Sequence, residues 1–258
     1  MSKPLRIGLI PYLNLYPLYF FLRVMPYQFI EGVPTEVNRL IREGMIDISP
    51  SSSVEFLRHG SLYRLIEGHS ISSIGEVKSI VLFSHYRIEQ LGGKNILSTY
   101  QSGTSVLLLE VILRRFYGLD YTLKISDKPL REGMKEADAY LLIGDDALKG
   151  SIEADSFYRY DLGKLWHEKT GLPFVYALWI ARKDVDEEAL KGFIYDLDRA
   201  RDFSVQNFPI VALSLRGESF MSEEEIVSYW RGLSYELTDE HRRGLELFKG
   251  YLEELGLL

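Results

Sequence analysis

Short apolar segments alternate with helical segments from the start of the chain, and this alternation restricts the fold more than any other feature. The expected strands are residues 6–10, 27–31, 45–48, 80–83, 96–99, 139–143 and 174–180. The expected helices include residues 18–24, 34–43, a helix opened by Ser52 and Glu55 as a capping box, a helix capped by Thr104, residues 161–169, and most of residues 186–258. Strands that alternate with helices predict an α/β protein with mainly parallel sheets, and two sets of such units predict two lobes.

The composition is that of a folded protein and excludes several classes of function. Hydrophobic residues make up 46% and charged residues 26% of the 258 residues, which are ordinary globular proportions. The chain has no cysteine, so disulfides, thiolate nucleophiles, iron–sulfur clusters and cysteine-based zinc sites are excluded. The formal net charge of −7 argues against a nucleic-acid partner, because phosphate binding requires clustered Lys and Arg. An anionic ligand would therefore be held by local dipoles rather than by the overall charge.

The apolar start of the chain is interpreted as strand, loop and helix rather than as a signal peptide. Pro11, Asn14 and Pro17 interrupt it, and no small-residue cleavage site follows it. The sequence also lacks a run of about 18 apolar residues, the length needed to span a bilayer. We therefore expect a cytoplasmic protein without a membrane partner.

Three loops combine small polar residues with a position between a predicted strand and a predicted helix. They are residues 12–16 around Asn14, residues 50–53 and residues 102–105. In open α/β sheets ligands bind at this edge, and the first N–H groups of a helix bind carboxylate or phosphate without a cationic side chain. For any single loop, helix capping is the more common role of Ser and Thr. The three loops together favour an anion-binding cleft.

Motifs for metal binding and for nucleophilic catalysis are missing from the sequence. None of the five histidines stands in an H-x-x-x-H or H-E-x-x-H arrangement, so we expect no metal site. The G-x-S-x-G, P-loop and G-x-G-x-x-G motifs are also absent. Asp145 and Asp146 follow a predicted strand, where an acidic pair is either a general base or metal pair, or the first turn of a helix. Capping explains Asp146 better, whereas both alternatives stay open for Asp145.

Several short motifs occur together in the order found in one enzyme family. They are Arg6-Ile7-Gly8, Tyr12-Leu13-Asn14, Ser51-Ser52-Ser53, Gly103-Thr104-Ser105-Val106, Ile143-Gly144-Asp145, Asp161-Leu162-Gly163 and Thr170-Gly171-Leu172-Pro173-Phe174-Val175. Over residues 6–182 this set resembles the chorismate dehydratases of the futalosine route to menaquinone. The remaining residues match that family only in their helical character.

This resemblance implies the type II periplasmic-binding-protein fold. That fold has two α/β lobes, two crossover strands and a ligand cleft between the lobes. Residues 1–83 and 175–258 are expected to form lobe 1, and residues 84–174 are expected to form lobe 2.

The resemblance also implies a lyase that converts chorismate to 3-[(1-carboxyvinyl)oxy]benzoate without a cofactor or a metal ion. Asn14 and Ser79 match the positions expected beside the reacting carbons. The expected substrate-binding residues come from both lobes and are Ser51, Ser52, Ser53, Gly103, Thr104, Ser105 and Asp145. The acceptor of the C3 proton stays open between the enolpyruvyl carboxylate of the substrate and a polarised water.

Two other functions stay open at this point. The enzyme that forms 1,4-dihydroxy-6-naphthoate is similar, but it has a histidine-containing loop where this chain has Gly144 and Asp145. A solute-binding protein for small carboxylates would share the fold, and the missing signal peptide and the specific motif set argue against it. Leu15-Tyr16 and Tyr100-Gln101 depart from the family pattern and leave fine specificity open.

Overall fold

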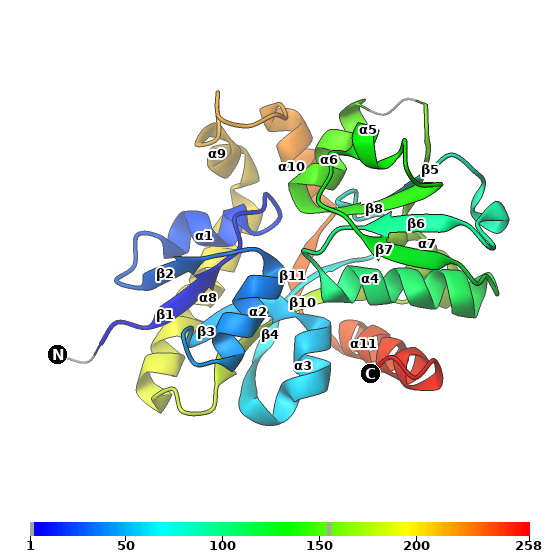
Figure 1. Cartoon of the computed structure of the whole chain (residues 1–258). Coiled ribbons are helices and arrows are strands. Elements are labelled where there is room, and N and C mark those ends of the chain that lie inside the picture. The colour runs from blue at the N-terminus through cyan, green and yellow to red at the C-terminus, as the bar shows by residue number, and fades with distance from the viewer. Residues whose placement is uncertain (1–2, 154–155) are drawn as a thin grey trace. The chain divides into compact units, whose positions relative to one another are not determined.

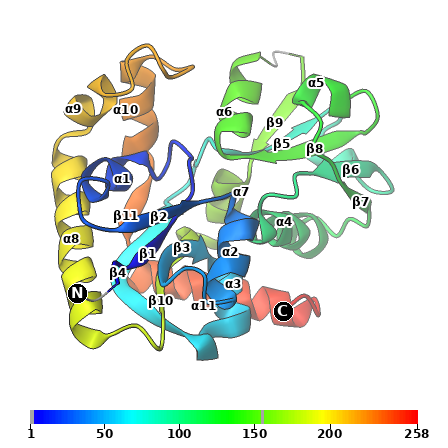
Figure 2. The same ribbon diagram turned by 60° about the vertical axis from the view of Figure 1, so that its left-hand side comes forward.

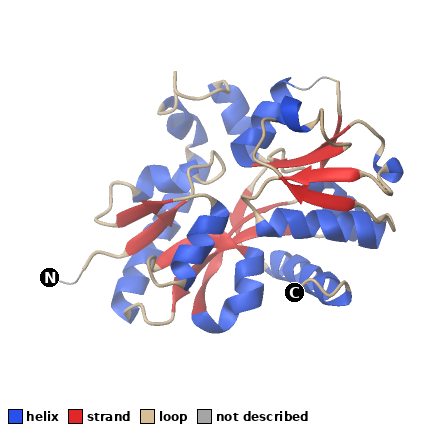
Figure 3. Ribbon diagram, viewed as in Figure 1, coloured by secondary structure: helices blue, strands red, loops and turns tan. Residues whose placement is uncertain are grey.

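The computed structural model describes residues 3–153 and 156–258, which divide into two compact units (Figure 1). Unit 1 comprises residues 3–72 and 176–237, and unit 2 comprises residues 73–153, 156–175 and 238–258. Each unit has its own β-sheet with helices packed on it, as the colouring in Figure 3 shows. The α/β class predicted from the alternation is confirmed. Among the helices of the described residues, none combines the length and the apolar character needed to cross a membrane.

The sheet of unit 1 has six strands in the order β11–β4–β10–β3–β1–β2. They are β1 (Arg6–Leu9), β2 (Gln28–Glu31), β3 (Ile48–Ser52), β4 (Tyr63–Ser73), β10 (Phe174–Arg182) and β11 (Ser234–Glu236). The helices are α1 (Tyr16–Leu22), α2 (Pro34–Arg42), α3 (Ser53–His59), α8 (Glu187–Gln206), α9 (Phe208–Leu213) and α10 (Glu223–Arg231). Helix α2 packs on β1 and β3, and Figure 2 shows α1 beside the long helix α8, against which it packs.

The sheet of unit 2 has five strands in the order β7–β6–β8–β5–β9. They are β5 (Ile80–Ser84), β6 (Asn95–Ser98), β7 (Thr122–Ile125), β8 (Ala139–Ile143) and β9 (Tyr158–Asp161). The helices are α4 (Gly103–Glu110), which continues as a π-helical segment (Val111–Phe116), α5 (Leu130–Gly133), α6 (Gly144–Glu153), α7 (Leu162–Thr170) and α11 (Asp239–Glu254). Helix α6 packs on β8 and β5, and α7 packs on β5 and β9.

Both sheets are mixed, which corrects the expectation of mainly parallel sheets. Strand β1 is parallel to β2 and β3, and β6 is parallel to β7 and β8. Strand β10 is antiparallel to β3, and β5 is antiparallel to β8 and β9. The parallel pairs are those joined by helical crossovers. The chain enters β5 from unit 1 and enters most of β10 from unit 2. No crossover helix within the same unit therefore forces either strand to be parallel to its neighbours.

The compact units differ from the expected lobes in two segments. The expected lobe 1 includes residues 73–83, but these residues belong to unit 2, where residues 80–83 lie in β5 and pair with β8 and β9. The expected lobe 1 also includes α11, but α11 belongs to unit 2. The Phe248 ring of α11 lies 4.8 Å from the Phe174 ring and 6.0 Å from the Trp166 ring, measured between centroids. Aromatic burial therefore decides where the C-terminal helix packs.

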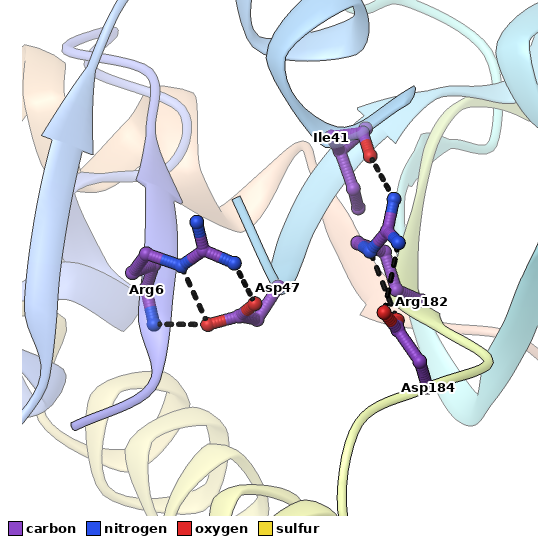
Figure 4. Close-up of polar contacts among 5 residues, drawn as sticks. All are labelled: Arg6, Ile41, Asp47, Arg182 and Asp184. Carbon is purple, nitrogen blue, oxygen red and sulfur yellow. Dashed lines mark hydrogen bonds and ion pairs between the residues drawn. The ribbon is translucent and has the colours of Figure 1, made fainter. Parts of the chain in front are cut away.

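Ion pairs fix one edge of the unit 1 sheet. The Arg6 backbone N–H and Nε donate to Asp47 Oδ2 at 2.8 and 3.0 Å, which ties the start of β1 to the start of β3 (Figure 4). At the end of β10, Arg182 Nε donates to Asp184 Oδ1 at 2.9 Å and Arg182 also reaches the Ile41 carbonyl oxygen. These contacts lie at the amino ends of the parallel strands β1 and β3. The loops at the carboxyl ends of the two strands, where α/β sheets usually bind ligands, are not involved in these contacts.

A buried histidine predicts a dependence of stability on pH. His69 of β4 has its Nε2 2.9 Å from Asp198 Oδ1 of α8, and burial lowers its pKa below the ordinary 6.5, with Arg201 acting in the same direction. The unfolded chain therefore binds this proton more readily than the folded chain, so stability falls as the pH decreases below 6.5. We expect His69→Gln to reduce the loss of unfolding free energy between about pH 7 and pH 5. Urea unfolding at several pH values measures this, and equal losses in both proteins would contradict it.

Candidate functional site

The loop after β1 is held by its backbone. The Tyr235 hydroxyl donates to the Asn14 carbonyl oxygen at 2.9 Å, and Trp230 Nε1 donates to the Leu13 carbonyl oxygen at 2.7 Å. The Tyr16 ring is stacked on the Trp230 ring, with centroids 6.2 Å apart and planes 3° apart. Side chains of α10 and β11 thus fix the loop that carries Asn14.

The side chain of Asn14 has an unused hydrogen-bond acceptor. Its Oδ1 is buried and has no hydrogen-bond partner within residues 3–153 and 156–258. A buried amide oxygen without a partner is costly, and most such atoms in folded proteins are satisfied. This position is therefore suited to a ligand that donates a hydrogen bond.

Ser51 and Ser52 lie inside β3 rather than in a loop after it, which corrects the boundary expected from the sequence. Both are buried. Ser51 Oγ lies 2.7 Å from Ser49 Oγ, and Asn38 Nδ2 of α2 donates to Ser52 Oγ at 2.8 Å. These hydroxyls are thus bonded within unit 1.

The capping box expected at Ser52 is half formed. Ser52 Oγ accepts the Glu55 N–H at 3.3 Å and caps α3, whose first residue is Ser53. The Glu55 carboxylate instead binds Arg42 at 2.6 Å and the Tyr63 hydroxyl at 2.7 Å. Ser52 therefore has a structural role, and the segment offers an anion mainly the N-terminal end of a short helix.

Helix α4 is capped by Ser102 of the preceding loop, which corrects the expectation that Thr104 is the cap. Ser102 Oγ accepts the Ser105 N–H at 3.2 Å and lies 3.0 Å from Ser105 Oγ. Thr104 and Ser105 are buried, and a side chain at Gly103 would meet open space. Ser102 is the better cap because its extended backbone precedes the first helical residue.

Ser79 lies in a turn directly before β5. It is buried, and its carbonyl oxygen accepts the Gly144 N–H at 2.7 Å. Among the described residues its Oγ reaches only the Val77 carbonyl oxygen, at 3.4 Å. Gly144 opens α6, so Asp145 lies in the first turn of that helix. The structure therefore brings Ser79 and the Asp145 segment together, and the helical alternative for Asp145 and Asp146 is confirmed.

In each unit the predicted residues gather at one edge of the sheet. In unit 1, Asn14 and Ser53 follow the carboxyl ends of the adjacent parallel strands β1 and β3. In unit 2, Ser105 and Asp145 follow the adjacent parallel strands β6 and β8, and Ser79 precedes β5, which is antiparallel to β8. Carboxyl ends of parallel strands are the usual ligand edge of α/β sheets.

A cavity of about 350 Å³ lies beside the Ser102 loop in unit 2. Its lining includes Tyr100, Gln101, Lys128, Asp146 and Lys149, and none of the predicted site residues. The sequence signals Tyr100 and Gln101, as departures from the family pattern, and Asp146, as a member of the acidic pair that follows a predicted strand. The two lysines stand in no motif, so spacing gives no sign that they share a cavity. Within the described part of the chain, no group of three or more side chains is arranged to hold a metal ion.

The sequence model of the menaquinone biosynthesis family matches residues 5–254. This chain belongs to the menaquinone biosynthesis family. A chorismate dehydratase of Thermus thermophilus is 29% identical to it, over 99% of this chain and 96% of that protein. A chorismate dehydratase of Campylobacter jejuni is 26% identical, over 78% of this chain and 79% of that protein.

The fold of this family member is also shared with solved structures. A Candida albicans protein, described as exhibiting the generic periplasmic binding protein structural fold, superposes with a TM-score of 0.72. The alignment covers 100% of this chain and 91% of that chain at 11% identity. The expected periplasmic-binding-protein fold and the motif resemblance to a menaquinone-forming family are both confirmed.

Proposed function

We propose that this protein is a chorismate dehydratase that acts in the cytoplasm, in the futalosine route to menaquinone. Its product is 3-[(1-carboxyvinyl)oxy]benzoate, and the reaction uses no cofactor. The observation that carries this proposal is the similarity to a chorismate dehydratase over 99% of the chain. The gathering of the motif residues at the ligand edge of each sheet supports it.

The reaction breaks the C3–H and C4–O bonds of chorismate and makes the ring aromatic. Loss of the C3 proton spreads negative charge through the conjugated ring onto the ring carboxylate. Hydroxide then leaves C4, and with the proton it forms water. N–H donors at a helix N-terminus stabilise the charge that develops on the carboxylate. We assign the two carboxylates of the substrate to the N-terminal ends of α3 and α4, which follow Ser52 and Ser102.

Asn14 and Ser79 are assigned to the reacting carbons. The buried Asn14 Oδ1 lacks a partner in the described residues and is suited to accept a hydrogen bond from the C4 hydroxyl. The Ser79 hydroxyl makes one long bond within the described part of unit 2, so it is able to donate to an oxygen of the substrate. The C3 proton has two available acceptors, the enolpyruvyl carboxylate and a polarised water. Ser51, Ser53, Gly103, Thr104, Ser105 and Asp145 complete the proposed substrate-binding set.

The purified protein is expected to convert chorismate to a product that is lighter by one water, in the presence of a metal chelator. Liquid chromatography with mass spectrometry measures the product, and chorismate incubated without protein controls for spontaneous decay. Absence of product at any protein concentration would refute the proposal. Tight binding of chorismate without product would instead indicate a solute-binding protein.

A further inference from the structure

The carboxylate of Asp161 binds two segments that are far apart in the sequence. Asp161 ends β9 and is the N-cap of α7, where its Oδ1 accepts the Lys164 N–H at 2.9 Å. The same carboxylate accepts the Lys78 N–H at 2.6 Å through Oδ2 and the Val77 N–H at 3.1 Å. One side chain therefore caps a helix and also holds the two residues that precede Ser79.

The turn held by Asp161 has an unfavourable backbone. Lys78 has a φ of +63° and is, within residues 3–153 and 156–258, the one residue other than glycine with a positive φ. This conformation costs an L-residue about 1 kcal/mol, and it persists only where surrounding contacts impose it. Asp161 supplies such contacts before Ser79, and the Gly144 N–H supplies one at the Ser79 carbonyl oxygen. The turn is thus fixed on both sides of the Ser79 side chain.

Capping alone does not account for this aspartate. A helix cap needs one acceptor, which Ser provides as well as Asp does. Burial raises the pKa of Asp161, and the N–H groups of Lys164, Val77 and Lys78 act in the opposite direction because each of them favours the charged carboxylate. The second oxygen, Oδ2, accepts the N–H groups of Val77 and Lys78 in the turn. The additional bonds are therefore the feature that distinguishes Asp161 from an ordinary cap.

We propose that Asp161 is a positioning residue for Ser79, whose carboxylate fixes the Val77–Lys78 turn and thereby the direction of the Ser79 hydroxyl. This inference rests on the proposed function, because it assigns Ser79 to the reacting carbons. Asp161 itself is not proposed to touch the substrate. Small displacements of a positioned group cost large factors in rate, so loss of the turn bonds acts on kcat more than on KM.

The test uses Asp161→Ser, which keeps a helix-capping hydroxyl but is too short to reach the turn. We expect kcat for chorismate to fall about 10- to 100-fold while KM changes less than about threefold. The matched control is Asp186→Ser at the N-cap of α8, where Asp186 accepts the Ala189 N–H at 2.9 Å and holds no such turn. That variant should keep the wild-type kcat. Equal kcat values for Asp161→Ser and wild type would overturn the proposal.

Two further measurements separate positioning from a general structural role. In a Ser79→Ala background, Asp161→Ser should lower kcat no further, whereas a structural role would add its full effect. Adding Lys78→Gly to Asp161→Ser should restore part of kcat, because glycine adopts the positive φ without strain. The positioning role would be refuted if the effects of Asp161→Ser and Ser79→Ala on kcat were additive and if Lys78→Gly restored no activity to Asp161→Ser.

Hydrogen exchange distinguishes failure of this inference from failure of the proposed function. Asp161→Ser should speed the exchange of the Val77 and Lys78 amides, and this readout does not depend on turnover. If the wild-type protein does not dehydrate chorismate, the proposed function fails alone. If exchange at these two amides is unchanged, the positioning inference fails, whatever the activity.

Discussion

Ser79→Ala is expected to lower kcat for chorismate dehydration by about 100- to 1,000-fold, the usual cost of removing one donor from a transition state. In the described part of the chain the Ser79 hydroxyl makes one bond, at 3.4 Å to the Val77 carbonyl oxygen, so its loss leaves the fold nearly unchanged. Asn14→Ala is expected to cost a similar factor. The Asn14 backbone is held by Tyr235 and its Oδ1 bonds nothing in the described residues, so the substitution removes a ligand contact rather than a structural one.

Steady-state kinetics followed by mass spectrometry measure these effects, with Ser84→Ala as the control. Ser84 is also buried and lies at the opposite end of β5, where its Oγ accepts the Tyr86 N–H at 3.0 Å. Its replacement should cost about 1 kcal/mol of stability and leave kcat unchanged. Near-normal turnover in both Asn14→Ala and Ser79→Ala would show that the reacting carbons lie elsewhere.

The sequence predicts strands where an apolar run is buried on both faces, and it misses strands at polar positions. Strands β5 and β8 are buried throughout and were predicted within two residues of their bounds. Strands β7 and β9 were not predicted, because each is an edge strand of the unit 2 sheet with mostly exposed or half-buried side chains. Strand β4 was missed for another reason: it contains Glu67, Gly68 and His69, and its neighbours β10 and β11 are distant in sequence.

Proline explains the error at β3. Pro50 was assigned to the loop that follows the apolar run of residues 45–48, yet it lies in the middle of β3 and pairs with Trp179 of β10. Proline has no N–H to donate to a sheet, so it is usually found in edge strands or at the start of a strand. This preference predicts that the strand ends before Pro50, which is wrong here. Because the strand extends to Ser52, the predicted serine loop became a strand end followed directly by α3.

In the candidate site, the sequence predicts features set by neighbouring residues and misses contacts between residues that are far apart in the chain. Helix starts after Ser52 and Ser102 are signalled by neighbouring residues, since capping is a local pattern. The contact between Asp161 and the Val77 N–H spans 84 residues, and no spacing in the sequence connects them. The motif containing Asp161 was recognised, but the turn that it holds is visible only in the folded chain.

Gly244→Ala is expected to be among the most destabilising single substitutions in unit 2. A Cβ at Gly244 would lie 2.1 Å from the Pro173 carbonyl oxygen, far inside the contact distance. That oxygen also accepts the Trp166 indole N–H at 3.2 Å, so it cannot move away without losing this bond. Helix α11 must instead shift, which separates the Phe248 ring from the Phe174 ring. We expect a loss of about 3 kcal/mol or more in unfolding free energy, the range of severe overpacking.

Gly250→Ala on the same helix is the matched control. Nothing lies within 4 Å of a Cβ at this exposed position, so alanine should raise the unfolding free energy by about 0.5–1 kcal/mol through its better helix propensity. Urea unfolding of both variants measures the difference. Equal stabilities would contradict the close contact between α11 and residue 173. Opposite signs would show that the C-terminal helix is an integral part of the core of unit 2, where Trp166 of α7 packs against Phe248.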